Sequence, residues 1–145
     1  MNFTHTILID DDPVLRFSIK KMITEHLFQK HFNSFASGYD AIDYLNNFNS
    51  IDENYKILVL LDFHMPVLAG REFLKLFEKQ LMHKTDMINI YILSSILVDK
   101  EKQELLEHDL VECFIKKPVT FEELREFFTP KKDSITTLKS IHYNI

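Results

Sequence analysis

The feature that most constrains this chain is the regular alternation of short apolar runs with stretches of helical periodicity. The clearest run, residues 57–61, is apolar at every position and therefore on both faces of any strand that it forms. Strands of this kind lie inside parallel sheets, where helices cover both faces. Four further short runs predict strands, at residues 6–9, 31–36, 88–93 and 111–115.

Between these runs, apolar residues recur at intervals of three and four, which predicts amphipathic helices. The helical segments are residues 14–28, 41–48, 73–81, 98–108 and 121–128. Strands that alternate with helices imply a parallel sheet with right-handed crossovers and helices on both faces. The length of 145 residues suits one domain. We expect this domain to occupy residues 1–129, with residues 130–145 as a tail or a short extra helix.

Rare residues exclude several classes of site. Two glycines are too few for a P-loop, a dinucleotide fingerprint or a Gly-x-Ser-x-Gly elbow, and the single Cys113 excludes an internal disulfide or a multi-cysteine zinc site. The net charge of -5 argues against nucleic acid or anionic lipid as a partner. Residues 10–12, all Asp, interrupt the N-terminal apolar stretch, and no run approaches membrane-spanning length. We therefore expect a cytoplasmic protein without a membrane partner.

Charged and hydroxyl side chains gather at the ends of the predicted strands. Residues 10–12 follow the first strand, Asp62 the third, Ser94 the fourth and residues 116–117, both Lys, the fifth. In an open parallel sheet, ligands bind at the carboxyl ends of the strands. Carboxylates crowded there repel one another unless a cation compensates, and hard divalent cations prefer carboxylate oxygens. Together with a hydroxyl and an ammonium, such a rim has the components of a phosphoryl-transfer site.

Four motifs at these strand ends carry a family resemblance. They are Ile-Leu-Ile-Asp-Asp-Asp-Pro at 7–13, Leu-Asp-Phe-His-Met-Pro at 61–66 followed by Gly70, Ile-Leu-Ser-Ser at 92–95, and Phe-Ile-Lys-Lys-Pro at 114–118. In this order, they resemble the motif set of response-regulator receiver domains of two-component signalling, over about residues 5–129. The resemblance implies an α/β, flavodoxin-like fold, with a doubly wound five-stranded parallel sheet of order 2-1-3-4-5 and helices on both faces.

The resemblance also implies a role for each acidic residue. Asp62 corresponds to the phosphoacceptor, which takes a phosphoryl group from the phosphohistidine of a histidine kinase or phosphotransfer protein. Asp11 corresponds to a direct ligand of Mg²⁺, Asp62 also belongs to the metal site, and Asp10 acts mainly through water. The backbone carbonyl of His64 is expected to complete the metal site. We expect Asp12 to face solvent or to cap the helix that starts near Pro13.

Three further positions follow from the same resemblance. Ser94 corresponds to the switch hydroxyl that contacts a phosphoryl oxygen, and Phe114 to an aromatic side chain that swings inward on activation or simply packs in the core. Lys117 corresponds to the phosphate-binding lysine. It is favoured over Lys116 because it directly precedes Pro118, and that bond is expected to be cis. The implied protein is a stand-alone response regulator, which is not an enzyme beyond its own phosphorylation and dephosphorylation.

Output from such a protein is expected through contacts with a downstream target protein, made by the fourth and fifth helices and the strand between them, or by passing the phosphoryl group on. One enzymatic alternative stays open on the sequence. Asp10 to Val14 also fits the Asp-x-Asp-x-Thr/Val pattern of haloacid-dehalogenase-like phosphatases, with Asp10 as nucleophile and Asp12 as general acid/base. That interpretation leaves Asp62 and the Met-Pro pair that follows it unexplained. The sequence also lacks the acidic pair at a strand end after Lys117 that the phosphatase pattern requires.

Overall fold

The computed structural model describes residues 3–27, 31–68, 70–96 and 99–128. It contains a five-stranded sheet of order β2-β1-β3-β4-β5. The strands are β1 (His5–Ile9), β2 (His31–Phe35), β3 (Ile57–Asp62), β4 (Ile88–Ser94) and β5 (Val111–Lys116). All neighbouring strands are parallel. The predicted flavodoxin-like sheet with its order 2-1-3-4-5 is thus confirmed.

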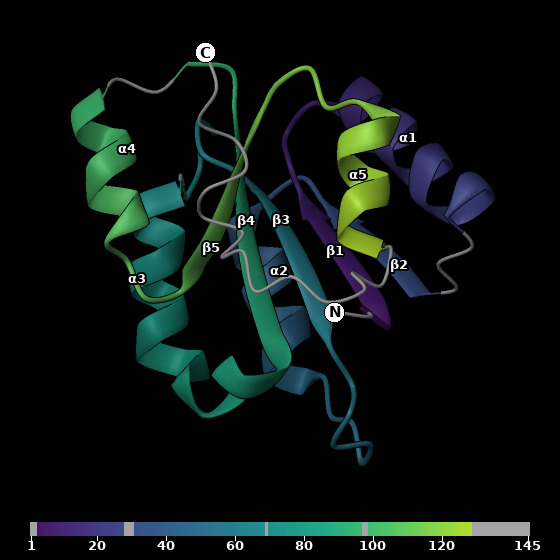
Figure 1. Ribbon diagram of the computed structural model, residues 1–145. Coiled ribbons are helices and arrows are strands. Elements are labelled where there is room, and N and C mark those ends of the chain that lie inside the picture. The colour runs from purple at the N-terminus through teal and green to yellow at the C-terminus, as the bar shows by residue number, and fades with distance from the viewer. Residues whose placement is uncertain (1–2, 28–30, 69, 97–98, 129–145) are drawn as a thin grey trace, which may run out of the picture.

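Helices cover both faces of this sheet (Figure 1). They are α1 (Pro13–Lys21), α2 (Gly38–Asn47), α3 (Gly70–Leu81), α4 (Asp99–Leu106) and α5 (Phe121–Phe128). The apolar cores show which helix covers which face. Buried residues of α1 and α5 pack with one face of the central strands, and those of α2, α3 and α4 pack with the other. No helix among the described residues is long and apolar enough to cross a membrane.

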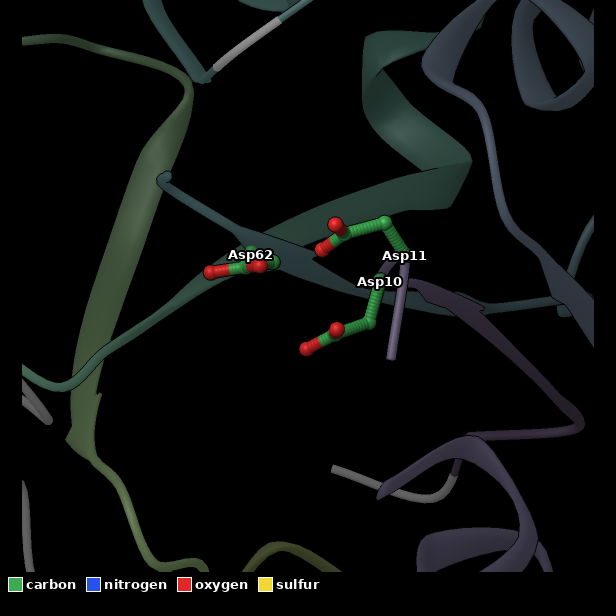
Figure 2. A group of neighbouring side chains, drawn as sticks. All are labelled: Asp10, Asp11 and Asp62. Carbon is green, nitrogen blue, oxygen red and sulfur yellow. The ribbon is translucent and has the colours of Figure 1, made fainter. Parts of the chain in front are cut away.

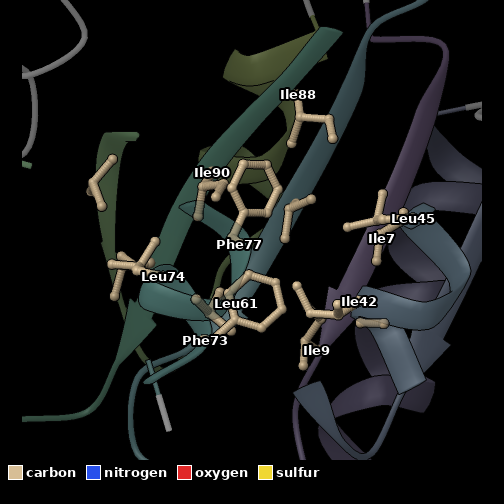
Figure 3. Packing of buried hydrophobic residues seen from close by; sticks show 14 of the residues in the cluster. Ile7, Ile9, Ile42, Leu45, Leu61, Phe73, Leu74, Phe77, Ile88 and Ile90 are labelled. Carbon is tan, nitrogen blue, oxygen red and sulfur yellow. The ribbon is translucent and has the colours of Figure 1, made fainter. Parts of the chain in front are cut away.

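The strand β3 explains why the apolar run at 57–61 predicted a central strand. Every residue of β3 is buried. Its alternate side chains enter different cores, so that Val59 packs with α2 and α3 while Leu60 packs with α1 and α5. Figure 3 shows the first core, in which Phe73 and Phe77 of α3 lie over the sheet. Burial on both faces requires an apolar residue at every position.

Several boundaries differ from the sequence prediction. The first helix is α-helical only to Lys21 and continues as a π-helical turn, Met22–His26, where the Thr24 hydroxyl donates to the Lys20 carbonyl. A 3₁₀ helix, Met82–Met87, follows α3 and was not predicted. The helix expected at 98–108 is described as α4 over Asp99–Leu106 only, because the chain tightens there: the His108 N–H donates to the Leu105 carbonyl. The tail expected at 130–145 lies outside the described residues.

Candidate functional site

Three carboxylates meet at the carboxyl end of the sheet. Because β1 and β3 are neighbours, Asp10 and Asp11, which follow β1, lie beside Asp62, the last residue of β3. One carboxylate oxygen from each lies within 4.8 Å of the others, and Figure 2 shows the side chains pointing toward a common region. Asp10 and Asp62 are buried, with 0% and 4% exposure, whereas Asp11 is exposed. Asp11 is thus the most open of the three to solvent, Asp62 keeps a small exposed surface, and Asp10 has none.

The loop that carries Asp10 and Asp11 is held by hydrogen bonds of its own backbone. The Asp10 N–H donates to the Phe35 carbonyl at the end of β2 (3.1 Å), and the Asp12 N–H donates to Asp10 Oδ1 (2.9 Å). Asp12 caps α1, since its carboxylate accepts from the backbone N–H groups of Val14 and Leu15. The structure thus makes Asp12 a helix cap, one of the two roles expected for it.

Lys117 joins the two buried carboxylates. Its ammonium lies 2.7 Å from Asp10 Oδ2 and 3.2 Å from Asp62 Oδ1. The neighbouring Lys116 is exposed, and the bond between Lys117 and Pro118 is cis, as predicted. Of the two adjacent lysines, the structure therefore brings Lys117 to the site.

These contacts leave the site electrostatically unbalanced. Burial and the charge of Asp10 raise the pKa of Asp62, although the Lys117 ammonium and the His64 N–H oppose this shift. Burial alone would lower the pKa of Lys117, but its hydrogen bonds and attraction to Asp10 and Asp62 hold that pKa above its ordinary value. One lysine remains charged but compensates the carboxylates only in part, so the site favours additional positive charge.

The loop after Asp62 is shaped by a close packing contact. The His64 N–H donates to Asp62 Oδ1 (3.3 Å), and its exposed side chain lies against the Phe63 ring. Gly70 lies so near Phe63 that a Cβ atom there would be 2.3 Å from the Phe63 ring. Any larger residue at 70 would displace Phe63, which is next to the acceptor. The role predicted for the His64 carbonyl stays a prediction.

Ser94 lies at the same rim, at the end of the strand beside β3. It is buried, and its hydroxyl donates to the Ile96 carbonyl (2.9 Å) rather than to a carboxylate. The Lys117 N–H donates to the Ser94 carbonyl (2.9 Å), so the two residues are joined through the backbone. Phe114 is half-buried and packs against the core beneath α2, α3 and α4. Its expected inward movement stays a prediction.

Arg16 is the site residue that sequence reasoning missed. Its Nη1 donates to the Asp10 carbonyl (2.6 Å), which ties the first turn of α1 to the acidic loop. An arginine on a half-exposed helix position ordinarily belongs to the solvated face. Nothing in the sequence distinguishes Arg16 from such a residue, because the contact depends on how the loop turns.

The three carboxylates fit a Mg²⁺ ion. Its oxygen ligands lie at 2.0–2.1 Å in octahedral geometry, which places two ligands roughly 3–4 Å apart. The observed 4.8 Å limit is close to that range, and small side-chain movements or a bridging water cover the difference. Asp11 and Asp62 would hold the ion. Asp10 is occupied by Lys117 and the Asp12 N–H, which suits a contact through water.

Solved structures share this arrangement of strands and helices. A two-component response regulator from Cytophaga hutchinsonii matches with a TM-score of 0.76 at 24% identity, over 88% of this chain and 96% of that chain. A response regulator receiver protein from Dyadobacter fermentans gives 0.73 at 21%, over 85% and 93%. The chemotaxis protein CheY4 of Vibrio cholerae gives 0.69 at 20%, over 86% and 95%. These likenesses show the fold, and no curated protein matches the chain.

The family itself is shown by the sequence match that spans the sheet and the site together. The model of the response regulator receiver domain matches residues 6–129, which include all three carboxylates, Ser94 and Lys117. Their convergence at one rim of a five-stranded parallel sheet agrees with that match. The chain therefore belongs to the response regulator receiver domains of two-component signalling.

Proposed function

We propose that this receiver domain accepts a phosphoryl group on Asp62 from the phosphohistidine of a histidine kinase or phosphotransfer protein, with Mg²⁺ as cofactor. The observation that carries the proposal is the position of Asp62 between a lysine ammonium at 3.2 Å and two further carboxylates. The lysine can neutralise phosphoryl oxygens, and the carboxylates can hold a cation. Neutralising charge and positioning the reactants are the main requirements of phosphoryl transfer.

In the proposed transfer, a carboxylate oxygen of Asp62 attacks the phosphorus atom. A P–O bond forms as the P–N bond to the donor imidazole breaks, and the imidazole nitrogen keeps the electron pair. Lys117 then exchanges its contact with Asp62 for one with the phosphoryl group, and the Ser94 hydroxyl turns from the Ile96 carbonyl to a phosphoryl oxygen. Mg²⁺, when bound, neutralises charge on the phosphoryl oxygens.

The burial of Asp10 favours this role over the phosphatase alternative. A phosphatase nucleophile must reach its substrate, but Asp10 has no exposed surface and its two oxygens are engaged by Lys117 and by the Asp12 N–H. The carboxylate of Asp12 caps α1, so it is not placed to act as general acid. We propose that the protein catalyses only its own phosphorylation and dephosphorylation. It acts in the cytoplasm, through contacts with a target protein or by phosphorelay.

Intact-mass measurement after treatment with acetyl phosphate and Mg²⁺ tests the proposal. The wild-type chain should gain the mass of one phosphoryl group, and chelation of Mg²⁺ should prevent the gain. Asp62→Asn should abolish it, whereas Asp12→Asn, which keeps a capping side chain beside the site, should not. Equal labelling of Asp62→Asn and wild type would remove Asp62 from its proposed role. Release of phosphate from an aryl phosphate by Asp62→Asn would support the phosphatase instead.

A further inference from the structure

The surface formed by α4, β5 and α5, away from the site, carries an excess of acidic side chains. Residues 99–128 contain nine acidic and five basic side chains, and one of those basic side chains, Lys117, belongs to the site. The exposed acidic residues include Glu107 and Asp109 after α4, and Glu122 and Glu126 on α5. We call this surface the acidic face. It favours a basic partner.

The acidic face also includes apolar side chains and the outer backbone edge of a strand. β5 is an edge strand, and no strand among the described residues pairs with its outer side. Figure 1 shows β5 running between α4 and α5. Phe114 on the α4 side of the sheet, and Val119 and Phe128 on the α5 side, are only partly buried. In α4, Leu105 is a buried anchor within a helix that otherwise carries mostly charged residues. A segment with an apolar stripe and positive charge would complement this surface.

The chain itself supplies such a segment. Residues 130–145 begin two residues after α5 ends, and they contain three lysines but one aspartate. Ile135, Leu138 and Ile141 recur at intervals of three, a spacing that is typical of the apolar stripe of an amphipathic segment. Sixteen residues span up to roughly 50 Å when extended. A domain of this size has a radius of gyration of about 14 Å, so the segment can reach any part of the acidic face.

Charge selects the acidic face over the surface on the other side of α5. There, α1 and the π-helical turn carry Arg16, Lys20 and Lys21 against Glu25. A basic segment is repelled by that surface and attracted to the other. We propose that residues 130–145 dock in cis on the acidic face, across the outer edge of β5. A docked segment competes with any target protein that uses the same face. This inference does not depend on phosphorylation of Asp62.

Paramagnetic broadening in the full chain tests the contact. A nitroxide is attached to the thiol of S140C, because the native Cys113 is buried and only 2% exposed. Amide signals of Gln103 and Glu104 in α4 should broaden, whereas those of Lys20 and Lys21 in α1 should keep their intensity. Equal broadening of α1 and α4 describes an undocked segment and overturns the proposal. Broadening of isotope-labelled chains by a separate, spin-labelled copy places the segment on a second molecule and also overturns it.

Charge reversal shows whether the acidic residues cause the contact. Glu122→Lys with Glu126→Lys should abolish the broadening of α4. Asp40→Lys with Asp43→Lys provides the control of equal charge change, because these residues are exposed in α2, on the face of the sheet opposite to α5, and this pair should leave the broadening unchanged. Adding Lys131→Glu and Lys132→Glu to the α5 reversal should restore the contact. Persistent broadening after the α5 reversal would refute the assigned face, and well-dispersed spectra of each variant exclude unfolding as the cause.

Discussion

The two ends of the sheet bury ionisable side chains in opposite ways. At the carboxyl end, Asp10 and Asp62 are buried together, and a single lysine contacts both of them. Asp11 adds a third carboxylate to this group. The pKa of Asp62 is raised by burial and by Asp10, so the folded chain retains a repulsion that it could relieve by binding a cation.

At the amino end, the buried His5 and the half-buried Lys84 are hydrogen-bonded to neutral partners. His5, which is 2% exposed, has Asn33 Oδ1 at 2.8 Å from Nε2 and the Tyr55 hydroxyl at 3.3 Å from Nδ1. Lys84, in the 3₁₀ helix after α3, donates to the carbonyls of Leu45, Asn46 and Phe48 at the end of α2. This lysine satisfies carbonyl groups that a helix end leaves without partners.

The two ends of the sheet therefore serve different purposes: the carboxyl end is arranged for binding, and the amino end for stability. Groups that serve only the fold are paired with neutral hydrogen-bond partners, as His5 and Lys84 are. Groups that must receive a cation and a phosphoryl group are left with like charges close together. The unliganded site therefore lowers the stability of the fold, whereas the hydrogen bonds at the amino end raise it. Removing a carboxylate from the unliganded site should consequently raise stability, whereas removing a hydrogen-bonded group at the amino end should lower it.

The largest effect is expected at the lysine that holds the carboxyl end together. Without Mg²⁺, Lys117→Met should lower the free energy of unfolding by roughly 3 kcal/mol, because it leaves two buried carboxylates uncompensated. Uptake of a proton by Asp62 limits the loss. Chemical denaturation in the presence of a chelator measures this change. Lys116→Met, at the exposed neighbouring position, should change stability by less than about 0.5 kcal/mol. Similar losses for both variants would contradict the comparison.

The corresponding lysine at the amino end should have a smaller effect. Lys84→Met keeps the aliphatic stem but removes the donor to three carbonyl groups, so we expect a loss of about 2 kcal/mol. Thermal or urea unfolding gives the value. Lys79→Met serves as the control, since Lys79 is exposed on α3 and has no interaction assigned within the described chain. A loss at Lys84 that exceeds the loss at Lys117 would reverse the ranking of the two ends.

His5 gives the amino end a pH dependence of known sign. Burial is the main cause that lowers its pKa from the ordinary value of 6.5, so the unfolded chain binds a proton more readily than the folded chain. Stability should therefore fall as the pH drops below about 6.5, by at most about 1.4 kcal/mol per pH unit. Unfolding measured across pH 5–8 should show this slope in the wild type and a reduced slope in His5→Gln. An unchanged slope in His5→Gln would assign the effect to another group.

Removing one carboxylate should improve the stability of the metal-free carboxyl end. Asp11→Ala eliminates a repulsion of roughly 1 kcal/mol between charges that lie within 4.8 Å of one another, so the metal-free variant should melt at a higher temperature than the wild type. Mg²⁺ should raise the melting temperature of the wild type, because it binds only the folded state, but not that of the variant. Asp109→Ala is the exposed control and should keep the Mg²⁺ response. Lower metal-free stability with an intact Mg²⁺ response would refute the role of Asp11.

The smallest effect concerns the polar atom that the amino end leaves without a partner. The Thr6 hydroxyl oxygen is completely shielded from solvent, and among the described side-chain polar atoms that are so shielded it alone has no hydrogen bond. Thr6→Val should therefore stabilise the chain by roughly 0.5–1 kcal/mol. Thr4→Val should instead destabilise the chain, because the Thr4 hydroxyl donates to the Lys56 carbonyl and accepts from the Lys56 N–H. Calorimetry of the two variants distinguishes these signs.

The sequence by itself determined the sheet and the composition of its functional rim. A strand buried on both faces must be apolar at every position, so residues 57–61 could be assigned to the centre of a parallel sheet from hydropathy alone. Parallel strands present their carboxyl ends on one edge, so the polar residues that follow them had to meet there. The four motifs resembling receiver domains then placed Asp62, Ser94 and Lys117 in order, and the match over residues 6–129 confirmed the family.

Only the tertiary structure decided how those residues share their contacts. Lys117 bonds Asp10 more closely than Asp62, Ser94 donates to its own loop, and Arg16 holds the acidic loop through a backbone carbonyl. The same holds for Lys84, whose partners lie 36–39 residues earlier in the chain. Local periodicity reports which side of an element is buried. It does not report the distances between elements that are far apart in sequence, and those distances determine which hydrogen bonds and charge pairs form.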